Sequence, residues 1–345
     1  MSRANKGRKK TGRSLLITVL LLAVIGGGLL GLHFWEEKNL AQEAAEIEAR
    51  SAQEDAAVLR LPTVQYNGQS YAFRDDLETL LIMGLDKYEN TLSDSESYIN
   101  NQQSDFLLLV IIDAEARSCC ALHINRDAMA EIQRLGLGGA RLGTFTGQLA
   151  LAHTYGSGEK DSCRNTVQAV SRYLYDIPID HYMSVTMDAV ATLNDLVGGV
   201  VVHIDDDFSA IDPTLVMGTD VRLRGQQALT FVRTRKDVDD QTNLSRMNRQ
   251  REYLYSLYTQ LIESMRQKDG FALDAARKLG DYTVSDLTVT ELSNLGERLK
   301  DYTFTTIYSI DGVAIKGERF MEFYTDDDAL RQTVIKLFYR LAEEG

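Results

Sequence analysis

The sequence predicts an α/β fold in which helices flank a mixed central β-sheet. Three observations favour this class. Apolar runs of strand length occur at 79–86, 106–113 and 118–124. Later strand-like runs alternate with segments of helical spacing, which is the pattern of a layered α/β domain. The chain has 345 residues, of which 44% are hydrophobic and 25% charged, so it can bury a substantial core.

An apolar segment near the N-terminus predicts a membrane anchor. Residues 15–34 contain no Asp, Glu, Lys or Arg, and a helix of about 20 residues crosses roughly 30 Å of hydrocarbon. Residues 1–13 carry six basic side chains and no acidic one, whereas Glu36 and Glu37 follow the segment, which favours a cytoplasmic N-terminus. We therefore expect a single-pass protein of the cell membrane with a cytoplasmic basic tail (1–14) and one transmembrane helix (15–35).

A cleavable signal peptide is the alternative for this segment. The apolar core of a signal peptide is usually about 7–15 residues long and ends in small residues. Here the run is longer and ends in the bulky Phe34 and Trp35, which favours an uncleaved anchor.

A helical stalk is expected between the anchor and the folded domain. Residues 36–60 are rich in Ala, Glu and Gln, lack Gly and Pro, and are followed by Pro62. A solvated linker over 36–62 would have nearly the same consequence. In either case the extracytoplasmic α/β domain occupies 63–345.

The turn between two predicted strands brings polar residues together. Only residues 114–117 separate the strand at 106–113 from the strand at 118–124, so we expect an antiparallel pair. The start of the first strand then lies beside the end of the second, which places Asp105 next to Arg126. Asp86 joins them if the strand at 79–86 is also antiparallel to its neighbour. The sequence therefore predicts a polar site at this end of the sheet.

The rest of the chain supplies further helices and strands. Helices are expected over 144–176 with a break at 155–158, over 187–197, over 244–265, and in the amphipathic segment 329–341. Strands are expected at 179–185, 200–204, 228–235 and around 304–310.

One basic segment stands out in an acidic chain of net charge −13. Residues 222–251 hold eight basic and three acidic side chains. In the expected strand, Arg233 and Arg235 share a face, and in the expected helix Arg246, Arg249 and Gln250 share another. Cations near a helix N-terminus are disfavoured by the macrodipole unless an anion binds there. The pattern therefore predicts a phosphate or pyrophosphate site, although pairing with the many carboxylates of the protein stays an alternative.

Nucleic acid is not an expected partner. Outside the basic segment the expected extracytoplasmic part is acidic, and it lacks interleaved aromatic side chains and a known nucleic-acid-binding module. A Ser/His hydrolase is disfavoured because there is no G-x-S-x-G motif.

A series of motifs resembles the LytR–CpsA–Psr family over roughly residues 75–265. In order they are GLD ending at Asp86, SD at Asp105, NRD at 125–127, the segment 177–204, LRGQQALTFVRTRK at 223–236 and SRMNRQRE at 245–252. The resemblance implies a mixed sheet flanked by helices, with an apolar tunnel for a prenyl chain. It also implies a membrane-anchored phosphotransferase that moves a glycopolymer, such as teichoic acid or capsular polysaccharide, from an undecaprenyl-pyrophosphate carrier to peptidoglycan, usually with Mg²⁺.

The resemblance also implies roles for individual residues. The pyrophosphate would be bound by a set of donors, namely Arg126, Arg233, Arg235, Arg246, Arg249 and Gln250. Asp105, Arg126 and Arg246 would be catalytic, and Asp86 and Asp105 would hold the metal or position the acceptor. The expected partners are the polyprenyl-pyrophosphate-linked glycopolymer, peptidoglycan and the membrane.

The chain departs from the usual family pattern at three polar positions. Gln103 replaces Arg in Arg-Ser-Asp-Thr, Asn125 replaces Pro in Pro-Arg-Asp, and Asn243 replaces an Asp three residues before Arg246. An asparagine cannot deprotonate a hydroxyl group. The alternative function is therefore a catalytically weak paralogue that binds wall polymer or its lipid carrier as a scaffold or regulator. A third function, transcriptional attenuation, conflicts with the expected extracytoplasmic location of the domain.

Overall fold

The structure is a computed structural model and describes residues 63–85, 99–235, 238, 242–318 and 320–342. The predicted tail, transmembrane helix and stalk (1–62) and the predicted ligand Asp86 lie outside the described residues. Within the described ranges, no helix has the length and apolarity required to span a bilayer.

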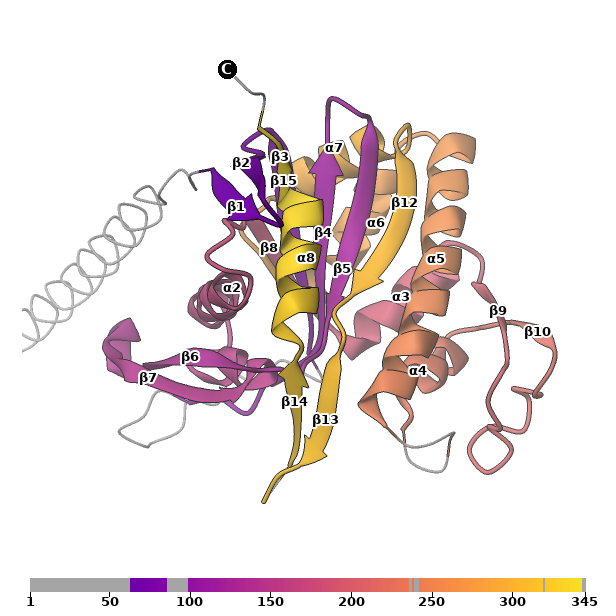
Figure 1. The fold of residues 1–345 in the computed structure, drawn as a ribbon. Coiled ribbons are helices and arrows are strands. Elements are labelled where there is room, and N and C mark those ends of the chain that lie inside the picture. Colours follow the sequence, from indigo (N-terminus) through magenta and orange to yellow (C-terminus); the bar gives the residue numbers. More distant parts are fainter. Residues whose placement is uncertain (1–62, 86–98, 236–237, 239–241, 319, 343–345) are drawn as a thin grey trace, which may run out of the picture. The chain divides into compact units, whose positions relative to one another are not determined.

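A six-stranded mixed sheet forms the centre of the fold (Figure 1). Its strands, in spatial order, are β11 (Thr283–Ser285), β8 (His181–Thr186), β3 (Leu77–Leu85), β4 (Ser104–Asp113), β5 (Ser118–Ile124) and β12 (Thr303–Ser309). The pairs β3–β4, β4–β5 and β8–β11 are antiparallel, whereas β3–β8 and β5–β12 are parallel. The predicted fold class and the antiparallel turn between β4 and β5 are thus confirmed.

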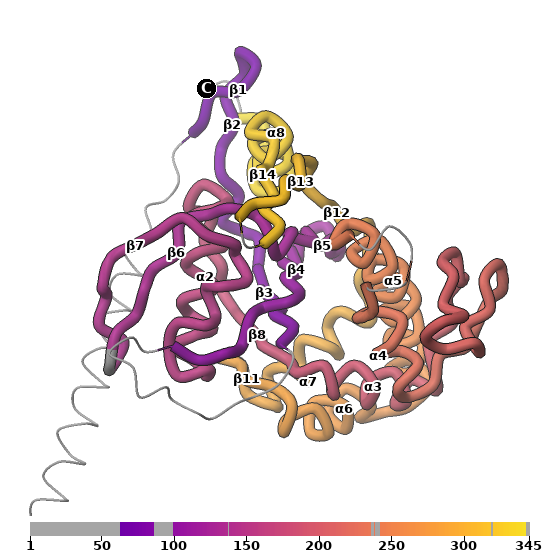
Figure 2. Tube along the Cα trace, turned by 90° about the horizontal axis from the view of Figure 1, so that it is seen from below, coloured from indigo at the N-terminus to yellow at the C-terminus, as the bar shows by residue number. Residues whose placement is uncertain are grey.

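Helices cover both faces of this sheet, which is why β3 and β4 are continuous apolar runs (Figure 2). On one face, Leu81, Leu107 and Leu109 pack into the main core with α2 (Lys160–Tyr173) and α8 (Asp327–Phe338). On the other face, Leu108 and Ala121 form a smaller cluster, against which Leu254 of α5 (Asn243–Gln267) packs.

A third apolar cluster joins helices on the α5 side of the sheet. It is centred on Phe208, Phe231 and Tyr253 and is fully separate from the main core. The helices on this side are α3 (Met187–Leu196), α4 (Gln226–Arg233), α6 (Phe271–Leu279) and α7 (Val289–Leu299).

Short strands and turns of 3₁₀-helix complete the described part. The strands are β1 (Val64–Tyr66), β2 (Gln69–Phe73), β6 (Met129–Leu135), β7 (Arg141–Gln148), β9 (Val201–His203), β10 (Asp220–Arg222), β13 (Gly312–Lys316), β14 (Met321–Thr325) and β15 (Tyr339–Leu341). The 3₁₀ turns are η1 (Leu137–Gly139), η2 (Leu149–Thr154) and η3 (Gly280–Tyr282).

Two secondary-structure predictions were wrong. Residues 228–235 were expected as a strand, but 226–233 form helix α4, because Ala228, Phe231 and Val232 recur at helical spacing and are buried. Arg233 and Arg235 therefore do not share the face of a strand.

The second wrong prediction concerns 144–176, where one broken helix was expected. Residues 141–148 pair with β6 as an antiparallel hairpin, and only 160–173 form an α-helix. Its partner β6 directly precedes it in the chain, but no strand was predicted at 129–135, so the hairpin was missed.

Candidate active site

Asp105 and Arg126 meet at one end of the central sheet, as the turn length predicted. Asp105 is the second residue of β4, and Arg126 follows the end of β5, whose Ile124 pairs with Leu107. Arg126 Nη1 donates to Asp105 Oδ1, and Arg126 Nε donates to Asp127 Oδ1 at 3.1 Å. The side chains of Arg126 and Asp105 are 14% and 21% exposed, so this ion pair reaches the surface.

Helix α5 adds Arg246 to the same place. Its Nη2 donates to the backbone carbonyl of Asp105 at 3.4 Å and to Asn243 Oδ1 at 2.5 Å. The residue is buried, and its Nε has no hydrogen-bond partner among the residues that the structure describes. Burial, together with the positive charges of Arg126 and Arg235, lowers the pKa of Arg246 to about 10. Among the described residues, Arg126 is paired with two carboxylates, whereas Arg246 donates only to a backbone carbonyl and an amide oxygen. The charge of Arg246 is therefore the one that favours a bound anion.

The start of α5 places these groups. Thr242 is the N-cap and accepts a hydrogen bond from the Ser245 N–H at 3.1 Å. The first turn contains no acidic side chain, and Asn243 occupies its first position. Asn243 Nδ2 donates to Asn125 Oδ1 at 2.8 Å, which ties the helix to the end of β5.

Asp127 orients Arg126 by accepting the hydrogen bond from its Nε. It is buried, its N–H donates to Asn125 Oδ1 at 3.0 Å, and its Oδ1 also accepts from Gln148 Nε2 at 2.7 Å. No motif in the sequence drew attention to Gln148, because it reaches Asp127 only through the β6–β7 hairpin. Asn125 and Asn243 were recognised as departures from a pattern, but their contact with each other was not predicted.

The structure brings together only some of the six predicted pyrophosphate ligands. Arg126 and Arg246 converge, and the charge of Arg235 acts on Arg246. Arg233 and Arg235 are exposed, at the end of α4 and just beyond it. Whether these residues bind pyrophosphate stays a prediction.

Arg249 and Gln250 make their hydrogen bonds within the protein. Arg249 is buried and donates to Asp206 Oδ2 at 2.6 Å, to Ser245 Oγ at 3.2 Å, and to the carbonyls of residues 231 and 234. Gln250 Nε2 donates to the carbonyl of Val232 at 3.0 Å. These contacts fasten the end of α4 to α5, so either side chain would have to exchange protein partners to reach a ligand.

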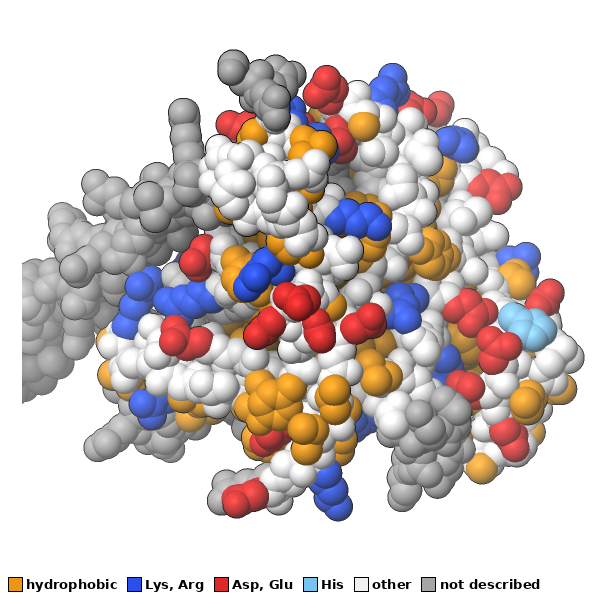
Figure 3. All heavy atoms as spheres, viewed as in Figure 1, with side chains coloured by type: hydrophobic (Ala, Val, Ile, Leu, Met, Phe, Trp, Pro, Cys, Tyr) orange, Lys and Arg blue, Asp and Glu red, His pale blue; other side chains and the backbone are white. Residues whose placement is uncertain are grey.

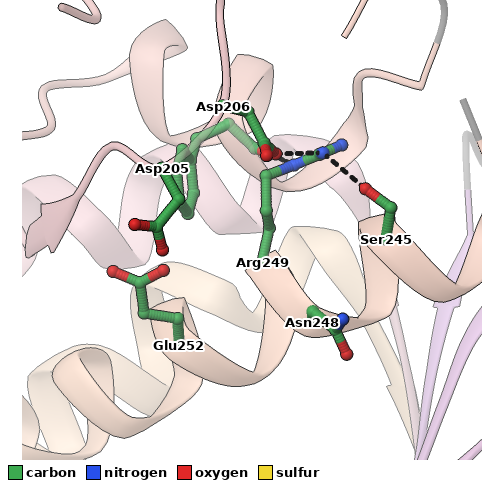
Figure 4. A pocket seen from close by; sticks show the side chains of 7 residues that line it. Asp205, Asp206, Ser245, Asn248, Arg249 and Glu252 are labelled. Carbon is green, nitrogen blue, oxygen red and sulfur yellow. Dashed lines mark hydrogen bonds and ion pairs between the residues drawn. The ribbon is translucent and has the colours of Figure 1, made fainter. Parts of the chain in front are cut away.

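A cavity of about 260 Å³ lies beside Arg249 and is lined by acidic groups (Figure 4). Asp205 and Glu252 point toward one another across it, while Asp206 turns to Arg249. Burial, together with the charges of Asp205 and Asp206, raises the pKa of Glu252. Because carboxylates repel phosphate, this cavity does not extend the cationic site around Arg246.

The predicted metal site has one carboxylate among the described residues. No group of three or more His, Cys, Asp or Glu in the described ranges could hold a metal ion. Mg²⁺ in phosphate-handling sites uses one or two carboxylates together with phosphate oxygens and water. Asp105 fits that requirement, since its side chain is partly exposed.

Apolar surface adjoins the two arginines on the α5 side of the sheet. Phe106 directly follows Asp105 in β4 and is only partly buried. Three apolar side chains near it are also only partly buried, namely Ile82 of β3, Val110 of β4 and Leu254 of α5. His123 is 2% exposed, and its ring centre is 4.9 Å from that of Phe106. Burial and the positive charges of nearby arginines lower the pKa of His123 to about 3, so it is neutral.

The chain is similar to known proteins over most of its length. The family model described as the LytR_cpsA_psr family matches residues 37–333. A relative from Halalkalibacterium halodurans, named polyisoprenyl-teichoic acid–peptidoglycan teichoic acid transferase TagU, is 26% identical over 307 residues, covering 89% of each chain. TagV of Bacillus subtilis, named as the same kind of transferase, is 27% identical over 312 residues, or 88% of this chain and 70% of TagV.

Solved structures share the fold. The crystal structure of B. subtilis TagV has a TM-score of 0.56 at 24% sequence identity, covering 76% of this chain and 97% of that chain. A structure of TagT bound to LIIa-WTA has a TM-score of 0.57 at 22% identity, covering 76% and 90%. The family model matches residues 37–333, and the SD and NRD motifs meet at one end of the β4–β5 pair through the contact of Asp105 with Arg126. The chain therefore belongs to the LytR–CpsA–Psr family.

Proposed function

We propose that this chain is a membrane-anchored phosphotransferase that moves a glycopolymer from a polyprenyl-pyrophosphate carrier to peptidoglycan. The observation that carries the proposal is the convergence of Arg126 and Arg246 on Asp105 at the end of the sheet. The transferase names of the relatives TagU and TagV support the substrate class. Residues 15–35 would hold the chain in the membrane, with the folded domain outside the cytoplasm.

The arginines would act electrostatically. In the proposed reaction, an acceptor hydroxyl oxygen bonds to the sugar-bearing phosphorus, the bridging P–O bond breaks, polyprenyl phosphate leaves, and the hydroxyl proton is released to water. Negative charge on the phosphate oxygens must be stabilised while the reacting oxygens are aligned. Arg126, oriented by Asp127, and Arg246, oriented by Asn243, supply donors held in place before the ligand arrives. No covalent intermediate on the protein is required.

Asp105 would serve the acceptor side of the reaction. One of its carboxylate oxygens is engaged by Arg126, and we assign to this residue, with Asp86, the positioning of the acceptor and the binding of Mg²⁺. Bound Mg²⁺ would neutralise charge on the phosphates. The partly buried apolar side chains beside Phe106 would contact the first part of the prenyl chain.

One observation favours a second function, in which the chain binds the lipid carrier without turnover. Asn243 stands where the family usually has Asp, and both described carboxylates nearby, Asp105 and Asp127, are paired with Arg126. Few groups are then free to accept the proton of the acceptor hydroxyl.

A transfer assay decides between these functions. The full chain in detergent is incubated with a polyprenyl-pyrophosphate-linked saccharide, peptidoglycan oligomers and Mg²⁺, and products are identified by mass spectrometry. A phosphodiester-linked product that depends on Arg126 supports the transferase. Saturable binding of the lipid with no product, at every Mg²⁺ concentration, supports the scaffold instead.

A further inference from the structure

The β13–β14 hairpin carries a cluster of exposed apolar side chains. Val313 pairs with Tyr324, and Ile315 pairs with Glu322, so Val313, Ile315 and Tyr324 share one face of the hairpin. They are 62%, 50% and 47% exposed, and Phe320 and Met321 near the turn are 41% and 43% exposed. Figure 3 shows hydrophobic side chains gathered at the lower edge of this face of the molecule, where β13 and β14 lie. We call these five residues the hairpin patch.

Cross-strand pairing and one buried side chain fix the orientation of the hairpin, so that Val313, Ile315 and Tyr324 face outward. Five cross-strand pairs join Gly312–Lys316 to Met321–Thr325. On the opposite face, Phe323 is 2% exposed and belongs to the main core. Gly312 permits this close packing, because a Cβ there would lie 2.6 Å from the Phe323 ring and 2.5 Å from the Tyr324 carbonyl oxygen.

The hairpin is hydrogen-bonded directly to the candidate active site. The Phe323 N–H donates to the carbonyl of Asp127 at 2.9 Å. Gln148 Nε2 donates both to Asp127 Oδ1 and to the Met321 carbonyl, at 2.7 Å each. Asp127 in turn holds Arg126. In Figure 1 the hairpin extends past the end of the sheet at which β5 passes into β6.

We propose that the hairpin patch inserts into the interface of the lipid bilayer and so holds the active site at the level of the lipid headgroups. This proposal rests on the proposed function, in which the pyrophosphate belongs to a membrane lipid and lies at that interface. Aliphatic side chains with a tyrosine are typical of an interfacial position, and the ammonium of the adjacent Lys316 can remain in water. Glu322 lies on the same face, opposite Ile315, and accepts a hydrogen bond from the Tyr324 hydroxyl at 2.7 Å, so insertion must be shallow enough to keep this carboxylate at the level of the headgroups.

A second copy of the chain fits the patch less well. At roughly 150–200 Å² per large side chain, the exposed fractions amount to roughly 450 Å², about half of the ~800 Å² per partner of a stable interface. Asp326, Asp327 and Asp328 are exposed directly after β14, and two copies would bring these like charges together. Insertion into a bilayer, in contrast, does not require a complementary partner surface of a minimum area. Because the neighbouring charges are acidic, insertion should not require anionic lipid.

Depth-dependent quenching tests insertion without relying on activity. The full chain is reconstituted in phosphatidylcholine vesicles with no donor present, and Ile315→Cys carries an environment-sensitive fluorophore. The control is Leu341→Cys, a residue that is 56% exposed and separated from the hairpin by the 12-residue helix α8. The native thiols should react slowly, because Cys119 and Cys163 are buried and burial raises the pKa of Cys120 to about 12.

We expect spin-labelled lipids to quench the label at position 315 severalfold more strongly than the label at 341, and no more strongly in anionic than in neutral vesicles. Equal weak quenching at both positions would overturn the proposal. Energy transfer between labels at 315 on different molecules, without lipid quenching, would assign the patch to a second copy instead.

A substrate comparison tests what the insertion does. In Val313→Asp/Ile315→Asp, kcat/KM should fall at least tenfold with a long-chain donor in vesicles and stay unchanged with a short-chain, water-soluble donor. An equal fall with both donors would contradict the membrane role. If the unmodified chain transfers neither donor, the proposed function fails, whereas the quenching result still decides the inference about the hairpin.

Discussion

The side-chain amide of Asn243 donates to Asn125 Oδ1 at 2.8 Å while its own oxygen accepts from Arg246 at 2.5 Å. These two asparagines stand at positions where the family usually has Asp and Pro. An amide both donates and accepts, whereas a carboxylate only accepts. The two departures from the family pattern therefore form one interaction, which holds Arg246 against the end of β5.

Asn125→Ala should lower the free energy of unfolding by about 1 kcal/mol. The substitution removes the oxygen that accepts from both Asn243 Nδ2 and the Asp127 N–H, and it places no new charge beside Arg246. Urea unfolding checks this, with Asn294→Ala on the exposed surface of α7 as the control. If the two variants are equally stable, the bond between the asparagines contributes nothing.

Arg246→Ala should weaken binding of geranylgeranyl pyrophosphate, used as a probe, at least tenfold, or about 1.4 kcal/mol. The substitution also removes the hydrogen bonds of this buried side chain to Asn243 Oδ1 and to the Asp105 carbonyl, so some loss of stability is expected beside the loss of affinity. Isothermal titration calorimetry and thermal unfolding measure the two effects separately. The control is Arg277→Ala at an exposed position of α6. Unchanged affinity in Arg246→Ala would remove this residue from the anion site.

Arg249→Met should act on stability instead of affinity. The substitution leaves Asp206, whose side chain is 16% exposed, without its guanidinium partner, and we expect a loss of about 3 kcal/mol in the free energy of unfolding. Affinity for the pyrophosphate probe should change less than threefold. In a double-mutant cycle, Asp206→Asn should restore part of the lost stability. A tenfold loss of affinity at unchanged stability would instead support the role that the family resemblance implies for Arg249.

Stability should fall on acidification below pH 6.5. Burial lowers the pKa of His153 to about 4, so as the pH falls from 6.5 the unfolded chain takes up a proton before the folded chain does. At pH 5 the loss from this histidine is about 2 kcal/mol. His153→Gln should show a smaller difference in urea unfolding between pH 7.5 and pH 5. The same pH dependence in the variant would assign the effect to other groups.

The local sequence was sufficient for the central strands and for the Asp105–Arg126 pair. Both β4 and β5 are apolar runs, and a four-residue turn allows only an antiparallel return, which determines which ends meet. The long helix α5 was also predicted, because its apolar residues recur at helical spacing.

Other features depended on contacts between distant segments. Residues 228–235 were predicted as a strand, yet residues 226–233 form helix α4, whose buried face packs with Tyr253 and Leu257 of α5. The basic face predicted for α5 divides in the structure: Arg246 turns to Asp105, whereas Arg249 turns to Asp206. Spacing on a helix shows which residues share a face, but the partners opposite that face come from elsewhere in the chain.

The sequence by itself determined the fold class, the end of the sheet at which the polar residues meet, and the family resemblance that the comparisons bear out. These follow from local periodicity, turn length and motif order. Tertiary structure alone decided that Arg126 and Arg246 converge, that Asn125 and Asn243 bond to each other, and that the β13–β14 hairpin presents its apolar side chains beside the site. Each of these depends on contacts between residues more than 100 positions apart along the chain, and such contacts leave no periodic trace in a single sequence.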